Sequence, residues 1–115
     1  MKINYNRRKF TAVSNSSSGQ VSGDTIFEYF QEGNHFTSLY SGGSIISGQM
    51  MGIVNEDNSL YFVYQHIDIH HALRSGYCHS TPEILEDGRI RLHEKWQWTY
   101  GGDSEGESVI EEISA

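Results

Sequence analysis

The stretch that most clearly indicates the fold reads DGRIRLHEKWQWT and covers residues 87–99. It opens on Asp87-Gly88, a dipeptide typical of tight β-hairpin turns. After the turn, large apolar side chains occupy every second position, with charged or polar side chains between them. A side-chain period of two is the pattern of a strand with one buried and one solvated face. The stretch therefore predicts a hairpin turn followed by a strand over residues 89–99.

One residue breaks the pattern of this strand. Glu94 lies on the predicted interior face, which it shares with Ile90, Leu92, Trp96 and Trp98. Burying a carboxylate costs several kcal/mol unless it is paired or hydrogen-bonded. Three interpretations of Glu94 stay open: a partly wet residue at a barrel mouth that bonds its neighbours, a group that orients a ligand, or a catalytic group.

The same turn predicts how the preceding strand, residues 74–85, pairs with this one. A two-residue turn places Tyr77 opposite Trp98, His79 opposite Trp96, and Thr81 opposite Glu94. In this register Cys78 faces away from the tryptophans, as a small packing residue. Pro82 favours a bulge or an edge position in the strand. The ligand-binding residues predicted from this register are Tyr77, His79, Thr81, Glu94, Trp96 and Trp98.

The rest of the chain also predicts strands. Its 12 glycines and single proline punctuate segments rich in β-branched and aromatic residues, which is typical of hairpins. Glycines at 48 and 52 inside a strand indicate a bulge or a sharp bend. Residues 15–19 are the most loop-like stretch, and residues 68–73 fit either a loop or one helical turn. The other predicted strands cover residues 9–14, 25–31, 35–41, 44–54, 60–67 and 107–113.

Eight strands joined by short turns predict an all-β fold, an antiparallel up-and-down meander. Closing the meander into a barrel removes the exposed edges and the apolar face that a flat sheet would present. We therefore predict one domain over residues 1–115, a closed or nearly closed barrel whose outline is similar to that of lipocalins. A barrel of eight strands is either filled by side chains or holds one small ligand.

Composition excludes several classes of protein. The 8 basic and 15 acidic residues give a net charge of −7, and the basic residues form no stripe, so we expect no nucleic-acid partner. No apolar run approaches the roughly 20 residues that span a bilayer, so we expect no membrane partner. The single cysteine cannot form an internal disulfide, and residues 1–10 lack the apolar segment of a secretory signal. These features favour a cytoplasmic protein, monomeric or homodimeric.

Motifs for catalysis and metal binding are weak. His66, His70 and His71 are close in sequence, but they fall where a strand runs into a loop, so we expect solvated histidines rather than a metal site. Ser, His and Asp occur without the Gly-x-Ser-x-Gly elbow of hydrolases. We therefore predict no catalytic residues, no metal and no cofactor.

Five groups of residues form a recognisable set of motifs: Asn15 with Gly19, Thr25-x-Phe27-x-Tyr29-x-Gln31-x-Gly33, Tyr40-Ser41-Gly42-Gly43-x-Ile45-x-x-Gly48-x-x-x-Gly52, Thr81-Pro82-Glu83, and Asp87-Gly88-x-Ile90-Arg91-Leu92-His93-Glu94-x-Trp96-x-Trp98. Through these motifs the chain resembles, over nearly its whole length, a family of short bacterial proteins of unknown biochemistry that often carry the label N-acetylglutamate synthase. Residues 68–73 depart from the family pattern, which there is a simple polar turn.

The family label implies acetyl transfer from acetyl-CoA to glutamate. Such enzymes hold the cofactor pyrophosphate on a glycine-rich loop that leads from a strand into a helix, and residues 49–54 are the nearest match but lack the final small residue. We therefore predict a non-catalytic module that binds a small ligand in an aromatic interior. The alternatives are acetyltransferase activity and a filled barrel that acts through its surface as a protein-interaction module.

Overall fold

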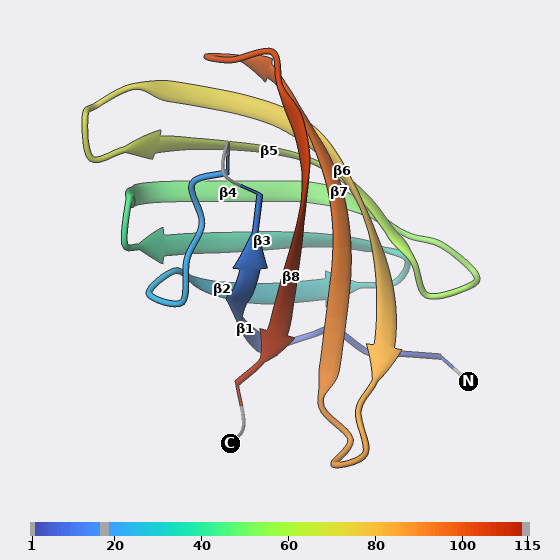
Figure 1. The fold of residues 1–115 in the computed structure, drawn as a ribbon. Helices are drawn as coiled ribbons and strands as arrows, with labels where there is room; N and C mark the ends of the chain where they lie inside the picture. The colour runs from blue at the N-terminus through green and yellow to red at the C-terminus, as the bar shows by residue number, and fades with distance from the viewer. Residues whose placement is uncertain (1, 17–18, 114–115) are drawn as a thin grey trace.

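The computed structural model describes residues 2–16 and 19–113. Ser17 and Ser18, in the predicted loop after the first strand, lie outside the described residues. Figure 1 shows that the described residues form strands joined by short connections, and they contain no helix. The strands are β1 (Lys9–Asn15), β2 (Ile26–Glu32), β3 (His35–Gly42), β4 (Ile45–Val54), β5 (Leu60–Asp68), β6 (Leu73–Ile84), β7 (Ile90–Tyr100) and β8 (Glu105–Glu112).

The strands close into a barrel. Each strand pairs antiparallel with the next along the chain, and β8 returns to pair with β1. The prediction of an all-β, closed, up-and-down meander is confirmed, and each predicted strand lies within two residues of the observed one. Closure pairs the first and last strands, which would otherwise present free edges.

Residues 68–73 form a tight turn rather than a helical turn. The Asp68 amide donates to the Ala72 carbonyl, and the Asp68 carboxylate accepts from the amides of His70 and Ala72. His71 takes a positive φ of 62°, a conformation that turns use. The β5–β6 hairpin therefore closes around the Asp68 side chain.

The predicted register between β6 and β7 is wrong by one residue. The Leu85 amide bonds the Arg89 carbonyl, so the loop holds three residues, 86–88, with Gly88 at a φ of 89°. A shift of one residue turns every side chain of a strand to the other face. The observed pairs are Gly76↔Trp98, Cys78↔Trp96 and Ser80↔Glu94.

The glycines inside β4 make room for aromatic rings. Gly48 pairs with Tyr40, and a Cβ at Gly48 would lie 2.3 Å from the Tyr40 ring. Gly52 likewise pairs with Phe36 and Phe62, and both ladders stay in register there, so the predicted bulge at Gly52 is wrong. Next to Gly48 the register does shift, between Tyr40 and Gly42 toward β3 and between Ile45 and Ser47 toward β5.

Pro82 occupies an edge-like position of β6, as the sequence predicts. The pairing of β6 with β5 ends at Leu60↔Ser80, whereas its pairing with β7 continues to Ile84↔Ile90. The β6–β7 hairpin thus extends beyond the barrel wall (Figure 1). Among the described residues no strand pairs with Pro82 on the side of β5, so the missing amide of Pro82 leaves no ladder hydrogen bond unmade on that side.

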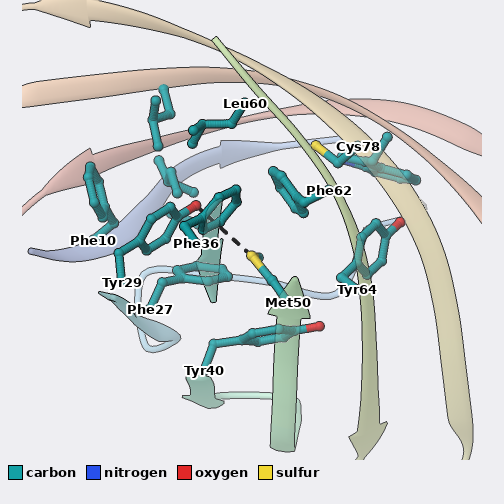
Figure 2. Close-up of a cluster of buried hydrophobic side chains, with 14 of the residues drawn as sticks. Phe10, Phe27, Tyr29, Phe36, Tyr40, Met50, Leu60, Phe62, Tyr64 and Cys78 are labelled. Carbon is teal, nitrogen blue, oxygen red and sulfur yellow. Dashed lines mark hydrogen bonds between the residues drawn. The ribbon is translucent and has the colours of Figure 1, made fainter. Parts of the chain in front are cut away.

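Aromatic and aliphatic side chains fill one end of the barrel, which we call the packed end. The N-terminal segment covers this end: the Tyr5 hydroxyl donates to the Asn58 carbonyl at 2.6 Å, and its ring contacts Tyr29. Tyr29 also stacks on Phe36 with ring centroids 5.3 Å apart, and Figure 2 shows these rings gathered inside the barrel. The residues of the packed end, all at most 1% exposed, are Tyr5, Phe10, Tyr29, Phe36, Leu60, Ile90, Leu92 and Ile110.

Candidate functional site

A cavity lies in the barrel interior beyond the packed end, and we call the residues around it the polar end. The connection from β1 to β2 reaches this cavity through Gly19, Gln20 and Val21. The volume of the cavity is about 40 Å³, which gives room for about three waters. The lining residues from the strands are Phe27, Tyr40, Met50, Phe62, Tyr64, His66, Cys78, Glu94, Trp96, Trp98 and Ser108.

Glu94 is the carboxylate of the cavity. It is 6% exposed, and its position in the middle of β7 places it between the neighbouring strands β6 and β8. The Ser80 hydroxyl donates to its Oε2 at 2.9 Å, and the Ser108 hydroxyl donates to its Oε1 at 3.0 Å. Burial raises the pKa of Glu94 to about 7, and the two serine hydrogen bonds partly offset the rise. Glu94 therefore changes charge close to neutral pH.

Aromatic rings form the walls of the cavity. The Trp96 and Trp98 rings lie 5.6 Å apart, and the Tyr64 ring lies 5.5 Å from that of Trp98. Glycines lie beside these rings: Gly106 pairs with Trp96, Gly76 pairs with Tyr64, and Gly102 lies 3.4 Å from the Trp98 ring, measured from the position of a Cβ. A Cβ at Gly106 would lie 2.5 Å from the Trp96 ring. The glycines therefore let the rings lie against the barrel wall.

A directed chain of hydrogen bonds crosses the mouth of the cavity. The Asp68 carboxylate can only accept, so it takes an N–H from Gln20 at 3.0 Å, which points the Gln20 amide oxygen at His66. His66 Nε2 then donates to that oxygen at 2.7 Å, and Nδ1 accepts from the Tyr40 hydroxyl at 2.9 Å. The chain thereby fixes His66 as the neutral Nε2–H tautomer.

Burial and hydrogen bonding set the charges of this chain. Desolvation lowers the pKa of His66 to about 4, so the imidazole is neutral at pH 7. Hydrogen bonds from Gln20 and the Ala72 amide lower the pKa of Asp68 to about 2, so the carboxylate stays ionised. Arg74 lies 3.8 Å from Asp68 and places its guanidinium 5.4 Å from the centroid of the Trp98 ring.

The remaining titratable groups of the cavity are uncharged. Burial raises the pKa of the Tyr40 and Tyr64 hydroxyls and of the Cys78 thiol. A thiol with a raised pKa carries little thiolate and is a poor nucleophile. Cys78 therefore acts as a packing residue, on the interior face rather than the predicted outer face.

The structure brings together three of the six predicted site residues. Glu94, Trp96 and Trp98 line the cavity as predicted. The placement of the other three in the interior is wrong, because the longer β6–β7 loop turns their side chains outward and leaves them exposed. These three residues are Tyr77, His79 and Thr81.

Sequence reasoning missed the residues that complete the cavity. His66, predicted as a solvated loop histidine, is 3% exposed in β5. Only a partial signal was present: Leu60, Phe62, Tyr64 and His66 occupy alternate positions of one strand, but Tyr61, Val63 and Ile67 between them are also apolar, so the pattern does not tell the inner face from the outer one. Gln20 comes from a connection without periodicity, and no sequence signal places it at His66.

The described residues contain neither a cluster of metal ligands nor a membrane-spanning helix. No group of three or more His, Cys, Asp or Glu side chains within residues 2–16 and 19–113 is placed to hold a metal ion. Over the same residues there is no helix long and apolar enough to cross a membrane.

Fold and cavity together define an eight-stranded up-and-down barrel with a partly polar interior, the class that includes lipocalins and streptavidin. Within this class the chain belongs to the avidin-like family, whose model, described as "Avidin-like protein", matches residues 3–113. Searches of curated proteins and of solved structures find no significant match.

Proposed function

We propose that this protein binds a small molecule in the cavity of the polar end and that it is not an enzyme. The observation that carries the proposal is the composition of the cavity: a buried carboxylate, Glu94, stands among the aromatic walls formed by Tyr64, Trp96 and Trp98. Binding cavities combine apolar walls with a few placed polar groups. An avidin-like barrel with an aromatic cluster suits such a module.

Retaining the buried carboxylate costs stability, which favours a binding role. An apolar residue at position 94 would avoid the desolvation of a carboxylate, and functional sites often carry such a cost. The hydrogen-bond chain from Tyr40 to Asp68 holds the mouth of the cavity in one arrangement. A fixed arrangement lowers the entropy that binding must overcome.

Tryptophan fluorescence tests the proposal directly, because both tryptophans of the chain line the cavity. We expect a metabolite library to contain compounds that shift or quench the emission saturably. Biotin belongs in the library, because streptavidin, a barrel of the same class, binds it. Glu94→Gln should weaken binding, whereas Glu107→Gln, an exposed glutamate on β8, should not. If no compound of the library changed the tryptophan emission, the proposal would be refuted.

Acetyl transfer is the enzymatic alternative, and acetyl-CoA separates the two functions. Residues 49–54, the nearest match to a pyrophosphate loop, lie inside β4, paired with β3 and β5. Their amides belong to the sheet ladder and not to a loop before a helix, so they do not form a phosphate cradle. We expect calorimetry to detect no binding of acetyl-CoA; saturable micromolar binding followed by formation of acetylglutamate would reverse this ranking.

The outer face favours a second candidate function, self-association. Met51, Val63 and Tyr77 face outward in one row across β4, β5 and β6, with exposed fractions of 67%, 58% and 43%. A continuous apolar surface of this kind is typical of interaction sites. We expect sedimentation to detect a dimer that Val63→Lys dissociates, and a monomer at all concentrations would exclude this candidate.

A further inference from the structure

Within residues 2–16 and 19–113 Glu94 has no cationic partner, and this bears on the chemistry of the ligand. The ion pairs of arginine side chains in the described part of the chain do not include Glu94. Its two hydrogen-bond partners, Ser80 and Ser108, are neutral. A buried carboxylate is neutralised either by a proton or by a counterion. A bound cation would supply the counterion that the protein itself lacks at this position.

The hydroxyl groups around the cavity already donate hydrogen bonds to other protein groups. Ser80 and Ser108 donate to Glu94, Tyr40 donates to His66, and Tyr64 donates weakly to the Gln97 carbonyl at 3.5 Å. A hydroxyl whose proton is used can still accept, and each carboxylate oxygen accepts more than one hydrogen bond. These hydroxyls and the Glu94 carboxylate therefore offer acceptors, which favour a ligand that donates hydrogen bonds.

The walls of the cavity also favour positive charge. Faces of tryptophan and tyrosine rings attract cations within about 6 Å of their centroids. Trp98 already carries one cation, the Arg74 guanidinium, at 5.4 Å. Trp96 and Tyr64 carry no such group among the described contacts, and both line the cavity with Glu94.

We propose that the ligand is a small organic cation with N–H donors, of the ammonium, amidinium or guanidinium class, with Glu94 as its counterion. This inference rests on the proposed function and names the ligand class of that same site. The cavity volume of about 40 Å³ limits the group bound there to a few heavy atoms. A larger ligand would place only its cationic group in the cavity.

Cation binding at Glu94 would be linked to the release of a proton. Because the pKa of Glu94 is about 7, much of the carboxyl is protonated in slightly acidic solution and must ionise to act as a counterion. The other described titratable groups that face Glu94 do not change charge in the same range: the hydroxyls and the thiol have raised pKa values, and the pKa of His66 is lowered to about 4. These facing groups are Tyr29 on β2, Tyr40 on β3, Tyr64 and His66 on β5, and Cys78 on β6.

Methylguanidinium and methylurea form the matched pair of probes, because they have similar size and planar shape, whereas methylurea is neutral and carries a carbonyl in place of one NH2 group. We expect methylguanidinium to bind at least about tenfold more tightly, read by tryptophan fluorescence at constant ionic strength. Below pH 7 its affinity should fall about tenfold per pH unit, the slope for release of one proton. The affinity of methylurea should not follow this slope.

Two variants complete the experiment. Glu94→Gln keeps the shape of the side chain and should erase the preference for the cation, whereas Glu107→Gln should retain it. The pH series on the unmodified protein gives the same answer if Glu94→Gln does not fold. Equal affinity for the two probes, or binding of neutral library compounds without binding of methylguanidinium, would overturn the inference and leave the proposed function standing. Failure of every probe and library compound would overturn both.

Discussion

The two ends of the barrel interior are built from the same strands but differ in chemistry. Along β5, Leu60 belongs to the packed end, whereas Tyr64 and His66 belong to the polar end. Along β7, Leu92 is followed on the same face by Glu94 and Trp96. The interior changes from apolar to polar between residues i and i+2, which are neighbours on one face of a strand. Depth along the barrel, rather than the choice of strand, thus decides whether an interior position is apolar.

The comparison separates what holds the fold from what prepares the site. The packed end consists of rings and aliphatic chains without charged groups, closed by the N-terminal segment through Tyr5. The polar end leaves a cavity and buries a carboxylate and an imidazole. Apolar burial stabilises a protein, whereas buried titratable groups reduce its stability unless they are satisfied. Stability should therefore come mainly from the packed end.

The largest effect expected is that of Phe36→Ala, at the packed end. Phe36 is 1% exposed, stacks on Tyr29 and meets Phe62 edge-on at 5.5 Å. Removal of its ring should lower the free energy of unfolding by about 3–5 kcal/mol, the range for buried aromatic residues replaced by alanine. Urea denaturation measures the loss. A loss below about 1 kcal/mol would mean that the packed end does not hold the barrel.

Glu94→Gln should have the opposite effect to Phe36→Ala at pH 8, because it should raise the free energy of unfolding. The folded-state pKa of Glu94, about 7, lies above its ordinary value of 4.5, so the folded state binds the proton more tightly than the unfolded chain does. The stability that this tighter proton binding gives to the folded state is fully present below about pH 4.5 and is lost as the pH rises through 7. The loss is on the order of 3 kcal/mol.

The glutamine variant should therefore be more stable than the unmodified protein at pH 8 and show little difference at pH 5. Parallel urea titrations at the two pH values measure this. Glu107→Gln, the exposed control, should show neither effect. Equal stability of Glu94→Gln and the unmodified protein at both pH values would place the carboxylate in contact with bulk water.

The fold could be predicted from turn spacing and alternation, but the site only in part. Asp87-Gly88 correctly marked a hairpin, yet the dipeptide fits loops of two or three residues, and that single residue decides which face of β6 is interior. Glu94 was recognisable as an exception in an apolar alternation. Its partner Ser80 was not recognisable, because the predicted register placed Thr81 opposite Glu94. Ser108 lies on β8, and no turn motif predicts how β8 aligns with β7.

His66 should show the reverse pH dependence to that of Glu94. Its folded-state pKa, about 4, lies below its ordinary value of 6.5, so the unfolded chain takes up the proton first and stability is lost as the pH falls from about 6.5 to 4. In the unmodified protein the two contributions oppose each other between about pH 4.5 and 6.5.

Single variants should separate the two pH dependences of stability, that of Glu94 and that of His66. Relative to the unmodified protein, Glu94→Gln should lose stability on acidification and His66→Gln should gain it, as measured by thermal melts between pH 4.5 and 6.5. Parallel curves for all three proteins would contradict both assignments. The polar end would then titrate like the surface.

The smallest effect compares two tyrosine hydroxyls, one from each end. Tyr40 at the polar end donates to His66 at 2.9 Å, so Tyr40→Phe leaves a buried imidazole nitrogen without its donor and should cost about 1–2 kcal/mol. Tyr29 at the packed end reaches only the sulfur of Met50, at 4.0 Å (Figure 2), and a thioether is a weak acceptor. Tyr29→Phe keeps the ring stacked on Phe36 and should change stability by less than about 0.5 kcal/mol. Chemical denaturation of the two variants side by side measures the difference. If Tyr29→Phe cost as much as Tyr40→Phe, the packed end would depend on hydrogen bonding as much as the polar end does, and the division of the interior into a stabilising half and a binding half would fail.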